Sequence, residues 1–130
     1  MQATIETEKA TRVDIRTQAL INNAFRRVIH TGAHEQVVVM TLPAHGEIGE
    51  EVHPDTDQLF YFVDGEGEAR VAGEDLAIVP GDLVFVEAGT RHNIVNRTGM
   101  PLRLITVYAP PAHAPGTVHQ TRQEAEAAEH

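Results

Sequence analysis

The sequence predicts an all-β fold, and three observations support this prediction. Short runs rich in Val, Ile, Leu and Phe recur between residues 35 and 108. Turn-forming residues separate these runs at short, even intervals, as at Asp64–Gly67, Pro80–Asp82 and Thr98–Pro101. No helical pattern of 10–15 residues lies between the runs, which disfavours a parallel sheet. Many short strands at this spacing are typical of a β-sandwich or a β-barrel.

Each apolar run is expected to form one strand. In chain order the runs are residues 35–42, 58–63, 68–72, 76–79, 83–86, 92–96 and 102–108. Side chains of one parity share a face of a strand, so Gln58, Phe60 and Phe62 face the same side. In the last run we expect Arg103 to face solvent. The residues of the other parity then face inward, namely Leu102, Leu104, Thr106 and Tyr108.

Helix is expected only near the chain ends. Thr121 and Glu124 form a capping-box pattern before Ala- and Glu-rich residues, which predicts a short exposed helix or a frayed tail. The prolines of residues 108–120 cannot donate to a central ladder, so this segment is expected to leave the barrel and run along its surface. We therefore expect a single domain over residues 1–130, with the barrel at about 35–110 and a tail at 111–130.

Composition excludes several classes of function. A net charge of −9, from 19 acidic and 10 basic residues, disfavours nucleic acid and anionic membranes as partners. Cysteine is absent, so any metal would be held by His, carboxylate or amide oxygen. No apolar stretch approaches 18 residues, and the N-terminus lacks the apolar centre of a secretory signal. We expect a cytoplasmic protein without a membrane span.

The stretch "EEVHPDTDQ" (residues 50–58) places a dense run of candidate metal ligands at the start of a core strand. Glu51 and His53 are two residues apart, so both can project the same way from an extended segment. The intervening "PDTD" (residues 54–57) has the composition of a turn, and we expect its aspartates to be turn formers. Such a turn lets the chain change phase, so that His53 and Gln58 converge.

A second signal follows in "GDLVFVEAGTRHNIVN", where two glycine turns flank a strand and a histidine begins the next one. This stretch resembles the second motif of the cupin superfamily, which reads G-x5-P-x-G-x2-H-x3-N. Gly81, Gly89, His92 and Asn96 fall at the motif's spacing, while Glu87 replaces its proline.

The first cupin motif, G-x5-H-x-H-x3,4-E-x6-G, fits in one register. Its opening glycine is displaced to Gly46, and its two histidines, its glutamate and its closing glycine correspond to Glu51, His53, Gln58 and Gly65. The resemblance covers roughly residues 35–110. Within the superfamily, the chain is similar to small single-domain, RmlC-like cupins with an EVHPDxDQ-type first motif.

This resemblance implies a double-stranded β-helix, or jelly roll, and a metal held by four side chains. Carried over, the usual set of three His and one Glu becomes Glu51, His53, Gln58 and His92. Two imidazoles and a carboxylate suit Fe(II), and the same atoms are compatible with Mn, Ni or Zn. Gln58 is either a ligand or a hydrogen-bond partner of the ligands. A register that uses Asp55 instead of Glu51 and a metal-free cupin remain as alternatives.

The resemblance implies a metal-dependent enzyme of the isomerase, lyase or dioxygenase type that acts on a small, oxygen-rich substrate. The alternative is a non-catalytic cupin that binds a small ligand or a partner protein. Tyr108 is a candidate catalytic residue, as an acid, a base or an orienting group, and Gln36 is another polar residue of inward parity. We expect a homodimer formed through edge strands.

Other polar residues near the barrel carry weaker signals. Arg26 and Arg27 could meet an anionic substrate, although such residues more often form ion pairs at a surface or a dimer interface. His113 and His119 lie in the proline-rich segment and could fold over the barrel mouth. We do not assign either histidine as a metal ligand.

Overall fold

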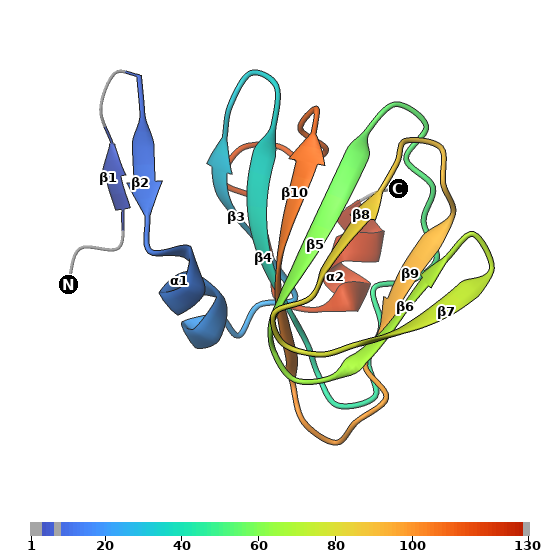
Figure 1. The fold of residues 1–130 in the computed structure, drawn as a ribbon. Helices are drawn as coiled ribbons and strands as arrows, with labels where there is room; N and C mark the ends of the chain where they lie inside the picture. Colours follow the sequence, from blue (N-terminus) through green and yellow to red (C-terminus); the bar gives the residue numbers. More distant parts are fainter. Residues whose placement is uncertain (1–3, 7–8, 129–130) are drawn as a thin grey trace.

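The computed structural model describes residues 4–6 and 9–128 and confirms the all-β prediction. One antiparallel sheet has the strand order β11-β3-β4-β10-β5-β8, and a smaller one has the order β7-β6-β9. The first sheet consists of β11 (Val118–His119), β3 (Arg26–Thr31), β4 (Gln36–Leu42), β10 (Leu102–Ala109), β5 (Asp57–Asp64) and β8 (Leu83–Val86). The second consists of β7 (Glu74–Ile78), β6 (Gly67–Val71) and β9 (His92–Val95). The two sheets face each other as a jelly roll (Figure 1).

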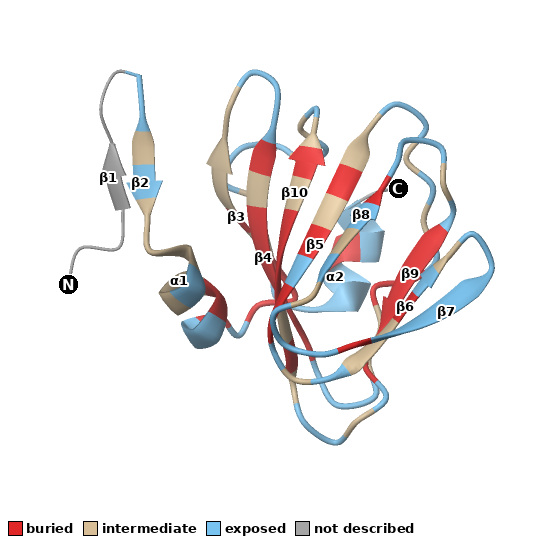
Figure 2. Ribbon diagram, viewed as in Figure 1, coloured by how far each residue is buried: buried red, intermediate tan, exposed pale blue. Residues whose placement is uncertain are grey.

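The core lies between the two sheets and follows the alternation of side chains along the strands. Phe60 and Phe62 of β5 and Leu104 of β10 are fully buried, and they pack with Ala69 and Ile94 of the smaller sheet. Figure 2 shows buried residues concentrated along β4, β10 and β9. The expected parity of β5 and β10 is therefore confirmed, because every second residue faces the opposite sheet.

The outer face of the six-stranded sheet is partly covered by elements near the N-terminus. Helix α1 (Ile15–Ile21) follows a hairpin of β1 (Thr4–Glu6) and β2 (Thr11–Val13), and it packs against β4, β5 and β10. The expectation that Arg103 faces solvent is wrong. Its parity is outward, but its guanidinium is half-buried and donates to the backbone oxygen of Asn22 and to Thr41 Oγ1.

Helix α2 (Arg122–Ala128) confirms the capping pattern predicted near the C-terminus. Glu124 N donates to Thr121 Oγ1 at 3.1 Å, and Gln120 N donates to Glu124 Oε2 at 3.3 Å. One residue of the helix, Ala125, is buried in the barrel core, so the helix docks on the barrel as well as being capped. Among the described residues, neither helix has the length and apolarity needed to cross a membrane.

Residues 110–120 form a strap across the barrel mouth. The strap is fixed at two points: β11, near its end, pairs with β3, and the amide of the fully buried Gln36 holds residues 112–113. Gln36 Nε2 donates to the carbonyl oxygen of His113 at 2.7 Å, while Gln36 Oε1 accepts from His113 N at 3.0 Å. The strap's alanines and prolines are largely exposed, as the surface-running segment was expected to be, but its histidines turn inward.

Candidate metal centre

Backbone pairing places Glu51 beside His92. The two residues exchange both of their main-chain hydrogen bonds, at 2.8 and 2.9 Å, in an isolated antiparallel bridge. Residues that face each other in this way project their side chains to the same side of the sheet. The segment before β5 thus extends the smaller sheet next to β9 and brings the first motif to the second.

His53 completes a cluster of three candidate ligands. Its Nε2 lies 2.8 Å from Glu51 Oε2, and Gly89 N donates to its carbonyl oxygen at 2.8 Å. One ligand atom from each of Glu51, His53 and His92 lies within 4.8 Å of the others, so the group could hold a metal ion. The His92 side chain is buried, whereas the side chains of Glu51 and His53 are 22% and 25% exposed to solvent. The cluster is therefore closed on the core side and reachable from solvent on the other.

Gln58 approaches the cluster from the opposite sheet. Both ring nitrogens of His92 face acceptor oxygens, with Nδ1 2.9 Å from the Thr90 carbonyl and Nε2 3.1 Å from Gln58 Oε1. The orientation of Gln58 is set because its Nε2 donates to Thr106 Oγ1, whose hydroxyl donates to the Leu59 carbonyl. A neutral imidazole has one N–H and can serve only one of two acceptors. With Nδ1 donating to the Thr90 carbonyl, the lone pair of Nε2 faces Gln58 Oε1, an arrangement that a metal ion between these two atoms would satisfy.

The surroundings of the Glu51 carboxylate favour its ionised form. Burial alone would raise its pKa, but the hydrogen bond from His53 and the charges of His53 and Arg26 outweigh burial and lower the pKa below 4.5. An ionised carboxylate beside two imidazoles is the donor set that divalent transition metals bind. The residues present fit such an ion.

The structure also places the residues of the alternative register. Asp57 is the first residue of β5, and its Oδ1 accepts a hydrogen bond from Ala88 N of a distant loop at 2.9 Å, so the expectation that Asp57 forms the turn is wrong. Asp55 is exposed and is not part of the three-residue ligand group. The geometry thus brings Glu51, not Asp55, to the two histidines. Asn96 of the second motif makes structural bonds, donating from Nδ2 to the carbonyl oxygens of Leu42 and Met100.

Tyr108 lies next to the candidate ligands. It is paired with Gln58 across β10 and β5, and its ring stands edge-on to His53 with centroids 5.8 Å apart. Burial raises the pKa of Tyr108 to about 12, with the charge of Arg26 acting in the opposite direction. The hydroxyl therefore remains protonated at neutral pH and can donate, but it is not a base.

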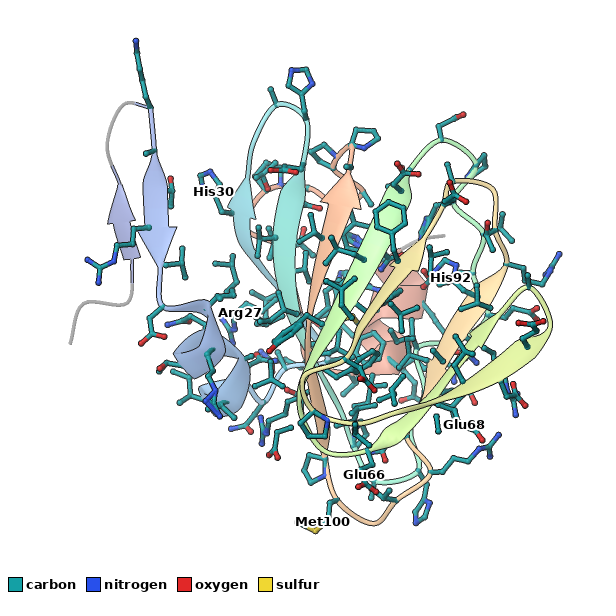
Figure 3. All side chains as sticks on the ribbon, viewed as in Figure 1. Arg27, His30, Glu66, Glu68, His92 and Met100 are labelled. Atoms are coloured by element: carbon teal, nitrogen blue, oxygen red, sulfur yellow. The ribbon has the colours of Figure 1, made fainter. Side chains whose placement is uncertain are left out.

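Arg26 occupies a place that its sequence context did not reveal. It begins β3 with 2% exposure, and its NH1 lies 3.4 Å from His119 Nδ1 while its NH2 lies 4.0 Å from Glu51 Oε1. Its neighbour Arg27 points the other way and donates from Nε to Asn22 Oδ1 (Figure 3). The surface ion pair favoured by sequence reasoning is therefore wrong for Arg26, which lies inside the barrel beside the ligand cluster.

His113 gives the strap a pH dependence. Burial, helped by the charge of Arg26, lowers the pKa of His113 from 6.5 to about 4. Between these values the unfolded chain binds a proton that the folded chain does not, so the free energy of unfolding falls as pH falls through this window. Because the ring is partly exposed, we expect a loss of only about 1 kcal/mol.

The control for this prediction is His113→Phe, which keeps an aromatic ring against Tyr108 but has no proton to bind. The rings of His113 and Tyr108 now stand edge-on, 5.0 Å apart. Urea unfolding of metal-free protein across the window should give a flatter pH dependence for the variant than for the wild type. Identical slopes would contradict the assignment of this titration to His113.

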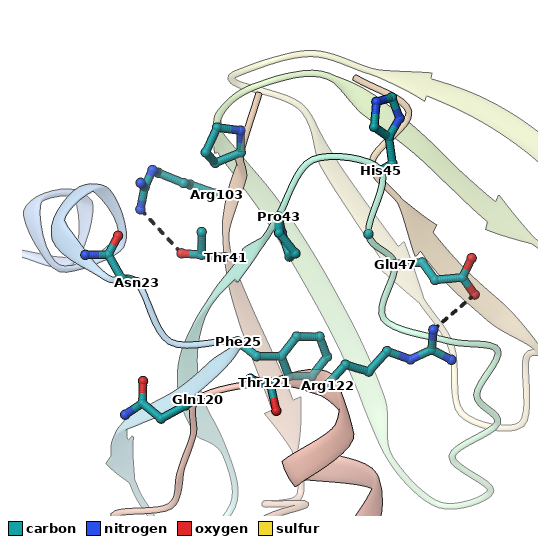
Figure 4. A pocket seen from close by; sticks show the side chains of 12 residues that line it. Asn23, Phe25, Thr41, Pro43, His45, Glu47, Arg103, Gln120, Thr121 and Arg122 are labelled. Carbon is teal, nitrogen blue, oxygen red and sulfur yellow. Dashed lines mark hydrogen bonds and ion pairs between the residues drawn. The ribbon is translucent and has the colours of Figure 1, made fainter. Parts of the chain in front are cut away.

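A separate cavity of about 520 Å³ lies at the other end of the barrel, beside Thr41 and Arg103 (Figure 4). Its arginine side chains already have hydrogen-bond or ion-pair partners. Arg103 donates to Thr41, and Arg122 pairs with Glu126 at 2.9 Å and with Glu47 at 3.8 Å. None of the three clustered ligands lines it, so the cavity is distinct from the candidate metal centre.

Two facing antiparallel sheets with a His and Glu cluster between them define a double-stranded β-helix protein with a candidate metal centre. A family model described as the cupin domain matches residues 38–108, more than half of the chain. The chain belongs to the cupin family. The narrower EVHPDxDQ subgroup stays a prediction.

Known proteins similar to this chain differ in how much of it they match. The protein YrkC of Bacillus subtilis is 37% identical over 90% of this chain, which spans 66% of its relative's length. The crystal structure of BH2720 from Bacillus halodurans superposes with a TM-score of 0.90 at 34% identity, covering 95% of this chain and 98% of that one. An oxalate-binding protein of Thermotoga maritima is 31% identical over 52% of this chain and 56% of its own length.

Proposed function

We propose that this chain is a metal-dependent enzyme of the isomerase, lyase or dioxygenase type, acting on a small, oxygen-rich molecule. The observation that carries the proposal is His92, whose two ring nitrogens both face oxygen acceptors beside an ionised carboxylate. A metal ion at Nε2 would satisfy this arrangement, and Glu51, His53 and Gln58 are the side chains that would share it. The ion we propose is Mn, Fe, Ni or Zn.

Each side chain around this centre has a proposed task. A bound divalent ion would act as a Lewis acid on a substrate oxygen. The backbone carbonyl of Thr90 fixes the ring of His92, and the hydroxyl of Thr106 fixes the amide of Gln58. His92 would therefore offer its Nε2 to the ion, and Gln58 its Oε1. Tyr108 would donate a hydrogen bond to the substrate, in keeping with its raised pKa. The apolar wall that includes Phe60, 5.8 Å from the His92 ring, would exclude water.

A substrate rich in oxygen is supported by the donor set and by one relative. Histidine and carboxylate ligands leave positions that oxygen atoms of a small molecule can fill. The Thermotoga maritima relative is named for binding oxalate, a small molecule of this kind.

Removal of Glu51 is expected to abolish metal binding. Protein would be purified without added metal, then loaded with Mn, Fe, Ni or Zn, and its metal content measured by elemental analysis. Wild type should hold close to one equivalent, and Glu51→Ala should lose it, with a fall in affinity of at least about 100-fold because a charged ligand is gone.

The matched control is Glu50→Ala, which removes a carboxylate one residue away. Glu50 is exposed and pairs with Arg91 at 3.4 Å, so its removal should leave metal content unchanged. A folded wild type that stays empty with every metal would support the non-catalytic alternative instead. For a metal-loaded protein, turnover in a screen of sugar acids, keto acids and diketones separates an enzyme from a ligand-binding module.

A further inference from the structure

We infer that the molecule bound at this centre is a small carboxylic acid with an oxygen on the adjacent carbon, such as a 2-oxo or 2-hydroxy acid, whose carboxylate is held by Arg26. The inference rests on the proposed function and names the chemical class of its ligand. It is carried by a buried, incompletely paired guanidinium beside the ligand cluster.

The guanidinium of Arg26 has unused hydrogen-bonding capacity. Arginine carries five N–H donors, and a buried donor without an acceptor is costly. Here the Nε of Arg26 is buried and has no partner, its NH1 meets His119 at 3.4 Å, and its NH2 is 4.0 Å from Glu51. No contact in this set is a short bidentate ion pair, which is the geometry that arginine forms with carboxylates.

A second buried nitrogen without a partner lies in the same region. Across the described residues, only two buried side-chain nitrogen or oxygen atoms lack a hydrogen-bond partner, Arg26 Nε and His113 Nε2. The two residues are neighbours, because the charges of Arg26 and Glu51 both act on the pKa of His113, and the ring of His113 lies 5.0 Å from that of Tyr108. The ring of His113 is held there by the main-chain bonds of the strap to Gln36. Two buried nitrogens without partners therefore lie near Tyr108, and the Nε of Arg26, which can only donate, needs an acceptor that a ligand can supply.

The charge of the site favours an anion. Arg26 and Glu51 cancel each other, and Gln58 contributes no charge. A divalent ion bound to neutral histidines would therefore leave an excess of about two positive charges in a largely buried cluster, which is unfavourable without compensation. A carboxylate on Arg26, with its neighbouring oxygen toward the ion, reduces that excess. A neutral ester of the same acid does not.

The test compares two probes that differ in this one group, pyruvate and its neutral methyl ester. Calorimetric titration of zinc-loaded wild type should show pyruvate binding at least about tenfold more tightly than the ester. Arg26→Gln should weaken pyruvate binding by about tenfold or more and leave ester binding unchanged, because one charge-assisted contact is lost. Arg27→Gln, at the adjacent outward position, should behave as wild type.

Metal content measured on the same samples separates this inference from the proposed function. Arg26→Gln should retain its zinc, since arginine is not a ligand. If wild type holds zinc but binds methyl pyruvate as tightly as pyruvate, the inference is wrong while the metal centre stands. That comparison needs no variant, so it decides the matter even if Arg26→Gln does not fold. A wild type that takes up no metal overturns the proposed function, and this inference with it.

Discussion

Replacing Gln58 with glutamate is expected to raise the affinity for a divalent metal ion by roughly 10- to 100-fold. Gln58 Oε1 already lies 3.1 Å from His92 Nε2, so the substitution places a negative charge where the amide oxygen was. The same change should destabilise the metal-free protein by roughly 1–3 kcal/mol. A buried carboxylate is desolvated, stands near Glu51, and cannot donate the bond that Gln58 Nε2 gives to Thr106.

Competition with a chelator measures the affinity, and urea unfolding of metal-free protein measures the stability. Gln36→Glu is the matched control, because Gln36 is another fully buried amide and lies two strands away on β4. It should lose stability, through its bonds to the strap, without a comparable gain in affinity. Unchanged affinity in Gln58→Glu would mean that Gln58 only orients His92 and does not reach the ion.

Replacing Gly65 with alanine is expected to destabilise the barrel by about 3–5 kcal/mol. Gly65 closes the first cupin motif and has a φ of +89°, a conformation that side chains disfavour. A Cβ at this position would also stand 2.4 Å from the carbonyl oxygen of Pro101 and 3.0 Å from the Cα of Leu102. Backbone atoms cannot swing aside as a side chain can, so the turn itself would have to move.

Gly73→Ala separates the two causes. Gly73 has nearly the same φ, +83°, but no atom lies within 4 Å of the position its Cβ would take. It should cost only about 1–2 kcal/mol, so the difference between the variants reports the clash at Pro101. Denaturant unfolding of both proteins provides the values. Equal losses would show that the turn after β5 relaxes freely.

Local pattern predicted much of this protein. The alternation in residues 58–63 and 102–108 assigned Phe60, Phe62, Leu104 and Tyr108 to the interior, because the side-chain period of a strand is two wherever the strand lies. Motif spacing brought Glu51 and His53 to His92, and the backbone bridge between Glu51 and His92 supplies the reason. The homodimer and the cytoplasmic location stay predictions.

Other features were missed because their signals were short. Helix α1 has seven residues, well below the length at which apolar periodicity is clear, and β3 begins with two arginines. Adjacent residues of a strand face opposite sides, so one arginine had to enter the barrel if this segment was a strand. The sequence of residues 26–31 does not itself indicate whether Arg26 or Arg27 faces inward.

The sequence alone determined the class of fold, the faces of its main strands and the four side chains proposed to meet at a metal. The tertiary structure alone decided that Arg26 points inward, through the pairing of β3 with β4 and β11, and that His113 sits over Tyr108, through its bonds to Gln36. The physical reason is the range of the interactions. A strand's periodicity is set by its own backbone, whereas these two placements depend on partners far away in the chain.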